Sequence, residues 1–110
     1  MEPDDARSLR SLLETRPVAA LGTLHRGDPA VSMVPFVLPA GQTQIIIHVS
    51  ALATHTADMQ RHPRVSLLVM AEPGADTPAQ ALARVSLQAD ARTLARDEAH
   101  YAAARTAYLA

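Results

Sequence analysis

The stretch VAALGTLHRGDPAVSMVPFVL, residues 18–38, decides the fold. Two apolar runs, 18–25 and 30–38, enclose Arg-Gly-Asp-Pro at residues 26–29, whose residue types favour a tight turn. The pattern predicts a β-hairpin. Pro35 lies inside the second run, and a proline has no N–H to give to a sheet. It therefore indicates an edge strand, a bulge or a stretch that faces a ligand.

Short elements continue on both sides of this hairpin. The predicted order is a helix over 4–15, strands over 18–25, 30–38 and 44–49, a helix over 52–61, strands over 64–70 and 81–94, and a helix from 97 to the end of the chain. Because hairpins dominate, a doubly wound parallel sheet is excluded. The sequence predicts a mainly β, α+β fold, with an antiparallel sheet or small barrel and flanking helices. A five-stranded sheet would leave an edge exposed, which a second subunit can cover.

Composition places the chain among ordinary globular domains. Its 110 residues are 48% hydrophobic, with a formal net charge of -1 and no cysteine, so we expect one domain over residues 1–110. The lack of cysteine excludes disulfides and a cysteine nucleophile, and it favours the cytoplasm. No apolar run approaches the ~20 residues of a membrane span, and the acidic first residues do not resemble a signal peptide. Interspersed charges and 3% aromatic residues argue against nucleic-acid binding.

The familiar catalytic motifs are absent from the sequence. There is no Gly-x-Ser-x-Gly elbow, no phosphate loop ending in Gly-Lys and no His-Glu-x-x-His pair. His55 and His62 would lie about 10.5 Å apart along a helix axis, too far to share one ion. We therefore expect no metal site, and no side chain stands out as a catalytic acid, base or nucleophile.

The junction between the third strand and the second helix, residues 48–56 (HVSALATHT), is the best candidate for a binding site. A helix N-terminus presents unpaired N–H groups and a partial positive charge, so it attracts anions. Ser50, Thr54, His55 and Thr56 add hydroxyl groups and an imidazole there. The residues leave two interpretations open: Ser50 or Thr54 caps the helix, or the group binds a phosphate.

Five segments, in this order, resemble the pyridoxamine 5'-phosphate oxidase-like, FMN-binding split barrels. They are residues 18–24 (VAALGTL), 27–36 (GDPAVSMVPF), 50–56 (SALATHT), 62–69 (HPRVSLLV) and 83–89 (ARVSLQA). The resemblance is closest to the branch of the HugZ-type haem-utilisation proteins, and it covers nearly the whole chain. It implies an antiparallel split β-barrel of six strands with peripheral helices, a homodimer, and FMN at the dimer interface.

The resemblance also implies which residues hold the cofactor. Polar residues would surround the FMN phosphate or ribityl chain, and a stretch of strand would lay its backbone against the flavin ring. The first group comprises Ser32, Ser50, Thr54, His55 and Thr56, and the second comprises Met33, Val34 and Pro35. Arg84 would add charge near the flavin or the phosphate. Arg64 either joins the site or pairs with an acid at the start of its strand.

The chain also departs from the family's pattern. Pyridoxamine-phosphate oxidases carry an arginine at the position of Ser32, a lysine at that of Val37 and a C-terminal arginine-rich segment, so oxidation of vitamin B6 is not implied. Asp58 stands where the branch has asparagine, and its negative charge would oppose an anion at the start of the helix. The family continues with a further strand, and the haem-utilisation branch with a haem-binding segment. We therefore expect an incomplete barrel or one that a partner chain completes.

The leading expectation is a homodimeric, cytoplasmic flavoprotein that binds FMN and acts as an oxidoreductase on a small molecule that the sequence does not identify. One alternative is a split-barrel binding or dimerisation module without enzymatic activity. Another is a haem-binding or haem-degrading protein with His48, His55 or His100 as the axial ligand. Convergence of Ser50, His55 and Arg84 on one dimer groove would favour a cofactor, whereas Arg84 paired with an acid and His55 facing solvent would favour the module.

Overall fold

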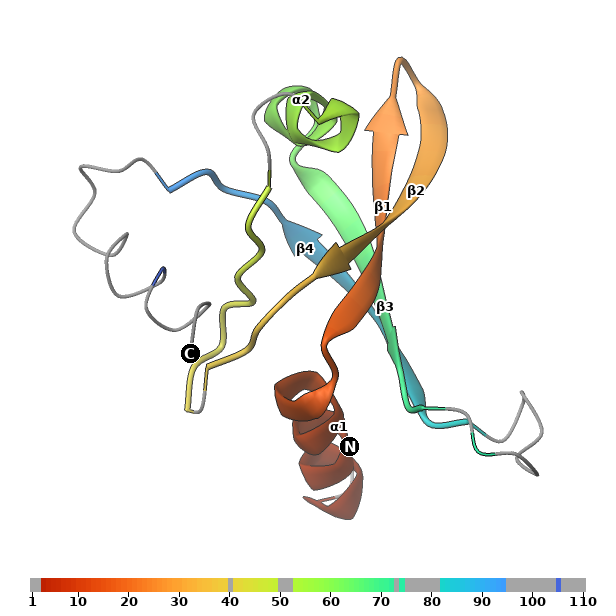
Figure 1. The fold of residues 1–110 in the computed structure, drawn as a ribbon, viewed down its shortest axis with the longest axis vertical. Helices are drawn as coiled ribbons and strands as arrows, with labels where there is room; N and C mark the ends of the chain where they lie inside the picture. Colours follow the sequence, from red (N-terminus) through yellow and green to blue (C-terminus); the bar gives the residue numbers. More distant parts are fainter. Residues whose placement is uncertain are drawn as a thin grey trace.

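Two helices and four strands make up the described part of the chain. The computed structural model describes residues 3–39, 41–49, 53–72, 74, 82–94 and 105. Its elements are α1 (Pro3–Thr15), β1 (Val18–His25), β2 (Asp28–Pro35), α2 (Thr54–Arg61), β3 (Arg64–Met70) and β4 (Arg84–Asp90). The strands form one antiparallel sheet in the order β2-β1-β3-β4 (Figure 1). The predicted antiparallel α+β fold is confirmed.

The hairpin of β1 and β2 forms as the sequence predicts. Pairing covers both strands from end to end, so only Arg26 and Gly27 lie in the turn. Both have a positive φ, of 52° and 85°. Two-residue turns with this backbone match the twist of the strands that they join. Glycine adopts such a φ without strain, whereas at Arg26 the Cβ makes this conformation sterically unfavourable.

β2 is an edge strand of the described sheet, because it pairs only with β1. Pro29 lies near its beginning and Pro35 at its end. Both prolines lack the N–H that a second neighbouring strand would need, which confines them to an edge. Of the interpretations that Pro35 left open, the edge strand is confirmed.

Pairing between the two halves of the sheet is short. β1 meets β3 over three residue pairs, of which Gly22–Ser66 is the last, whereas β3 and β4 pair along their whole length. Beyond Gly22 the β1–β2 hairpin diverges from the β3–β4 pair, toward the end of the sheet where α2 lies (Figure 1). The sheet is therefore split at this end.

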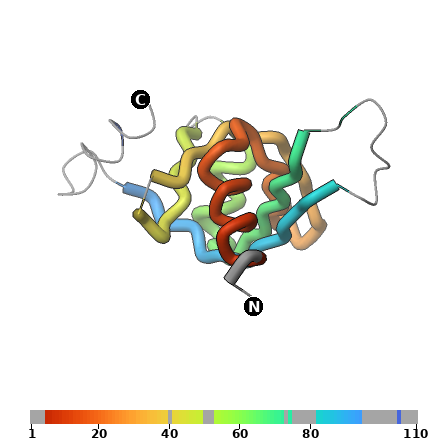
Figure 2. The backbone as a smooth tube through the Cα atoms, turned by 90° about the horizontal axis from the view of Figure 1, so that it is seen from below, coloured from red at the N-terminus to blue at the C-terminus, as the bar shows by residue number. Residues whose placement is uncertain are grey.

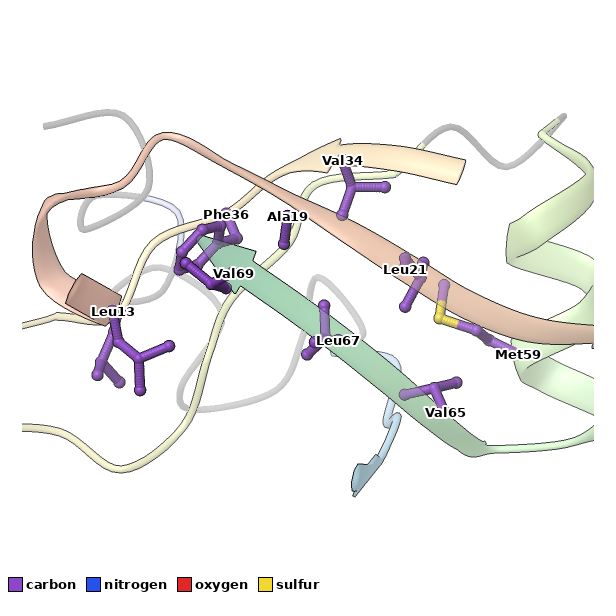
Figure 3. Packing of buried hydrophobic residues seen from close by; sticks show 10 residues of the cluster. Leu13, Ala19, Leu21, Val34, Phe36, Met59, Val65, Leu67 and Val69 are labelled. Atoms are coloured by element: carbon purple, nitrogen blue, oxygen red, sulfur yellow. The ribbon is translucent and has the colours of Figure 1, made fainter. Parts of the chain in front are cut away.

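The hydrophobic core lies on one side of the sheet, here called the core face. Alternate residues of β1 and β3 point into it, and Leu21 and Val69 are the most deeply buried. α1 contributes Leu13 and α2 contributes Met59 (Figure 3). α1 lies across one end of the sheet, between residues 41–49 and the β3–β4 pair (Figure 2). The side chains that alternate with the buried ones point to the opposite side, the open face.

Residues 44–49 do not form the predicted strand. One antiparallel bridge joins Val37 and Ile46, with N···O distances of 3.0 and 2.9 Å. The β-branched neighbours pack, partly buried, against the core; they are Ile45, Ile47 and Val49. Such residues favour an extended backbone, but a strand also needs a partner along its length, and β2 ends before this segment can pair with it. The described sheet has four strands rather than five.

Several other bounds differ from the prediction by a few residues. The second strand ends at Pro35 rather than 38, α2 begins at Thr54 rather than 52, and β4 spans Arg84–Asp90 rather than 81–94. The predicted helix from 97 onward lies outside the described residues except for Arg105, which is helical. No helix in the described ranges has the length and apolar character needed to cross a membrane.

Candidate functional site

The first turn of α2 presents backbone N–H groups that no side chain caps. The residue before the helix is Ala53, and no side chain forms a cap hydrogen bond with the helix there. No acidic residue lies in the first turn. Thr54 is already the first helical residue, so the prediction that it caps the helix is wrong, and Ser50 lies outside the described residues. An uncapped helix start of this kind favours an anion.

A contact between β2 and α2 brings two of the predicted residues together. Ser32 Oγ lies 3.4 Å from His55 Nδ1, although 23 residues separate them in the sequence. Ser32 points to the core face, because it pairs with the buried Leu21. Both partners are half-buried. At 3.4 Å the hydrogen bond is long and weak, so hydroxyl and imidazole remain able to bind a further group beside the start of the helix.

The carboxylate of Asp58 is buried and bound to His25. The Asp58 Oδ1 lies 2.9 Å from His25 Nδ1, and the Asp58 side chain is 7% exposed against 43% for His25. A buried carboxylate needs such a partner, because its burial without one costs on the order of several kcal/mol. The pair links α2 to the end of β1. The Asp58 carboxylate, which was expected to oppose an anion at the start of the helix, is therefore hydrogen-bonded to the His25 imidazole.

The remaining predicted residues lie on different sides of the sheet. Thr56 is a buried residue of α2, and Val34 is buried in the core. Met33 and Pro35 point to the open face. Arg84 is exposed on β4, at the opposite edge of the sheet from β2. Because β1 and β3 lie between those edges, Arg84 does not reach the start of α2 within one chain.

The apolar character of the open face is not among the predictions made from the sequence. Large hydrophobic side chains are exposed there on three neighbouring strands: Val31 (76% exposed), Met33 (73%), Leu68 (40%), Leu24 (39%) and Met70 (39%). The available signal was the apolar residues at alternate positions in β2 and β3, between those that the core takes. A strand that is apolar at both sets of positions is typical of a sheet that is buried on both faces.

A groove of about 350 Å³ opens on this face where the sheet splits, here called the split groove. Its walls combine apolar side chains with polar ones: Leu24, Pro29 and Val31 with Arg64, Ser66 and Gln88. Arg64 Nη1 lies 3.3 Å from Asp90 Oδ1, and both side chains are largely exposed. The alternative in which Arg64 pairs with an acid is therefore confirmed. Within the described ranges, no three His, Asp or Glu side chains group closely enough to hold a metal ion.

Several known relatives of the chain have names that refer to haem. The non-canonical heme oxygenase HOZ, chloroplastic, of Arabidopsis thaliana is 38% identical over 86 residues, which are 78% of this chain and 25% of the relative. The structure of a heme binding protein from Mycobacterium smegmatis superposes with a TM-score of 0.82 and 34% identity, covering 99% of this chain and 43% of the other. This chain therefore spans a quarter of the first and less than half of the second.

A second solved structure supports the fold alone. HutZ, the heme storage protein from Vibrio cholerae, superposes with a TM-score of 0.78 at 23% identity, covering 91% of this chain and 70% of the other. The family model described as Pyridoxamine 5'-phosphate oxidase matches residues 6–110. This match spans nearly the whole chain and agrees with the antiparallel split sheet described above. The chain belongs to the pyridoxamine 5'-phosphate oxidase family, with the split-barrel fold of its haem-binding relatives.

Proposed function

We propose that this chain is a haem-binding split-barrel module that acts as a homodimer. The observation that carries the proposal is the open face, where Val31 and Met33 are about three-quarters exposed beside Leu68 and Met70. Contiguous exposed apolar surface marks a place where a ligand or another protein binds. The names of the relatives with 38% and 34% identity, a heme oxygenase and a heme binding protein, support haem as that ligand.

The open face fits the porphyrin ring better than it fits the iron. Haem is a flat and largely apolar ring with carboxylate side chains on one edge, and its iron takes axial ligands such as histidine. Apolar side chains and the exposed guanidinium of Arg64 suit the ring and the carboxylates. None of the described histidines lines the split groove. Bound haem supplies redox chemistry through its iron, and the chain supplies the surface that holds and orients it.

The proposed homodimer depends on the same face. A second copy that covers the part of the open face around Met70 would remove apolar surface from water, which favours association. It would also bring residues of both chains to one cofactor. Within one chain, the residues at the start of α2 and those on the open face lie on opposite sides of the sheet and do not meet. With no cysteine in the sequence, we place the dimer in the cytoplasm.

FMN is the second candidate ligand, and a different observation favours it. The uncapped start of α2 and the Ser32–His55 contact form a site for a phosphate, and no acid lies in the first turn of the helix. In that case Thr54, His55 and Ser32 would hold the phosphate, and Ser50 would join them as the resemblance implies. Bound flavin supplies hydride and electron transfer, which would make the chain an oxidoreductase of unidentified substrate.

Absorbance spectroscopy of the purified protein, titrated separately with haemin and with FMN, tests both candidates. We expect haemin to give a Soret band that stays with the protein through gel filtration. His55→Ala, on the α2 side, is expected to leave that band unchanged and to weaken any binding of FMN. Retention of FMN alone would overturn haem in favour of the flavoprotein, and retention of neither would leave a binding or dimerisation module without a cofactor.

A further inference from the structure

The geometry points to the split groove as the place where one edge of the haem ring is seated, with Arg64 bound to a haem carboxylate. This inference rests on the haem function proposed above and gives it a location. It concerns a different part of the molecule from the start of α2 and the Ser32–His55 contact. Nothing in the local sequence motifs marks the groove, because its parts come from all four strands.

The groove exists because the pairing of β1 with β3 stops early. Gly22–Ser66 is the last pair of that ladder, yet β1 continues to His25 and β3 has already begun at Arg64. Beyond this pair the ends of β1 and β3 no longer pair with each other, although β1 still pairs with β2 and β3 with β4. Side chains of the open face line both ends, with Leu24 on β1 and Arg64 on β3.

The floor of the groove is a single row of residues across the sheet. Val31 pairs with Gly22, Gly22 with Ser66, and Ser66 with Gln88, so the four lie side by side on the open face. Gly22 has no side chain, and a Cβ there would run into Ser66 Oγ, so the Ser66 hydroxyl lies over the glycine. The middle of the row therefore presents a small polar group between Val31 and Gln88.

The next row continues the floor away from the groove. Met33, Ala20 and Leu68 are neighbours on adjacent strands. In this row a small residue on β1 lies between two large apolar residues, of which Met33 is 73% and Leu68 40% exposed. The two rows together form a shallow trough along β1. A groove of about 350 Å³ lies at the small end of ligand sites, so it would hold one edge of the ring while the trough contacts the remainder.

Arg64 provides charge complementarity at the mouth of the groove. Its guanidinium lies 3.3 Å from the Asp90 carboxylate, with the two side chains 63% and 74% exposed. An ion pair this exposed contributes little stability, so the guanidinium can exchange Asp90 for a ligand carboxylate. Arginine binds carboxylates through parallel hydrogen bonds that fix their orientation. The apolar walls and the cation at the mouth together match a largely apolar ligand with an anionic edge.

Haemin titration of three variants tests this location. Val31→Asp places a charge on the wall of the groove, and Arg64→Met removes the cation while it keeps the length of the side chain. Each is expected to weaken haemin binding about tenfold, the change that loss of one charge-assisted hydrogen bond or apolar contact produces. Arg61→Met, an exposed arginine at the end of α2, is the matched control and should bind as the parent does. Circular dichroism and the molar mass in solution verify folding and assembly.

The dimethyl ester of haemin isolates the role of Arg64, since the ester has no carboxylate. We expect it to bind the parent chain and Arg64→Met with equal affinity. Paramagnetic broadening of backbone amides by haemin then locates the ring directly, with Leu24, Val31 and Ser66 affected first. If the parent chain binds no haemin, the haem function and this inference both fail. If the parent binds haemin but the variants bind equally well, and broadening centres on His55, only the location is overturned.

Discussion

The two sides of the sheet treat their side chains in opposite ways. On the α2 side, polar groups are matched in pairs: the buried Asp58 carboxylate binds His25, and Ser32 contacts His55. On the open face, large apolar side chains such as Val31 and Met33 stand in solvent. Apart from the uncapped start of α2, the polar groups named on the α2 side thus have partners within the chain. The open face has requirements that only a ligand or a second chain can meet, which is why we place haem and the partner subunit there.

The difference also separates the two candidate cofactors. The α2 side offers a small, polar site of the kind that binds a phosphate, at a helix start without a cap. The open face offers a broad apolar surface with the cation of Arg64 at one end. FMN carries a phosphate and haem does not, so the two cofactors would use opposite sides of the same sheet. Changes on each side can therefore be read independently.

The largest expected effect contrasts one residue from each side of the hairpin. Leu21 is 1% exposed on the core face, and Leu21→Ala should lower the free energy of unfolding by about 2–5 kcal/mol. Val31 is 76% exposed on the open face, and Val31→Ala should change it by less than about 0.5 kcal/mol in the isolated chain. Urea denaturation at several protein concentrations measures both. A loss for Val31→Ala that grows with concentration would show that a second copy covers this residue.

A smaller effect is expected for the polar pair that anchors α2. Asp58→Ala removes the acceptor of His25 and should cost about 1–3 kcal/mol, the range for loss of a buried hydrogen-bond partner. Asp58→Asn keeps a side-chain oxygen that can accept the same bond, so it should cost less than the alanine variant. Thermal or chemical denaturation compares the two. Equal losses would mean that the negative charge, rather than the hydrogen bond, holds α2 to β1.

The smallest expected effect concerns the uncapped start of α2. Ala53→Asp supplies a side chain that can accept from the first N–H groups, and it should raise the free energy of unfolding by about 0.5–2 kcal/mol. The same change should weaken binding of inorganic phosphate, because cap and anion compete for the same N–H groups. Thr43→Asp, at an exposed position outside the helices and strands, controls for added charge. Unchanged stability would indicate that these N–H groups already have acceptors.

Local chemistry was enough to predict several parts of the fold. The turn at Arg26 and Gly27 follows from their place between two apolar runs, and Pro35 indicated an edge because it lacks an N–H. The stretch over 44–49 shows the limit of this reasoning. Its β-branched residues indicated a strand, but only Ile46 has a bridging partner. A single stretch of sequence does not contain its partner, so pairing had to come from the rest of the chain.

The candidate sites divide in the same way. Ser32 and His55 could be named from motifs, but their contact depends on how α2 packs against the β1–β2 hairpin. The split groove could not be named at all, because its floor joins Gly22, Ser66 and Gln88 from separate strands. A further surprise is Ala53, since the hydroxyl residues around it suggested a capped helix. Several neighbouring residues could cap the helix, and the backbone conformation of the folded chain decides which of them takes the N-cap position.

The sequence by itself determined the antiparallel character of the fold, the hairpin turn, the edge strand and the family. Each of these depends on interactions between residues close in the chain or on a recognisable order of motifs. Only the tertiary structure decided that the β1–β3 ladder stops at Gly22, that Asp58 binds His25 and that Arg84 lies far from the start of α2. Those outcomes depend on how strands twist and separate after they have paired. How far two strands stay paired is decided by the sum of many weak contacts between residues distant in the sequence, and no local pattern of residues contains that information.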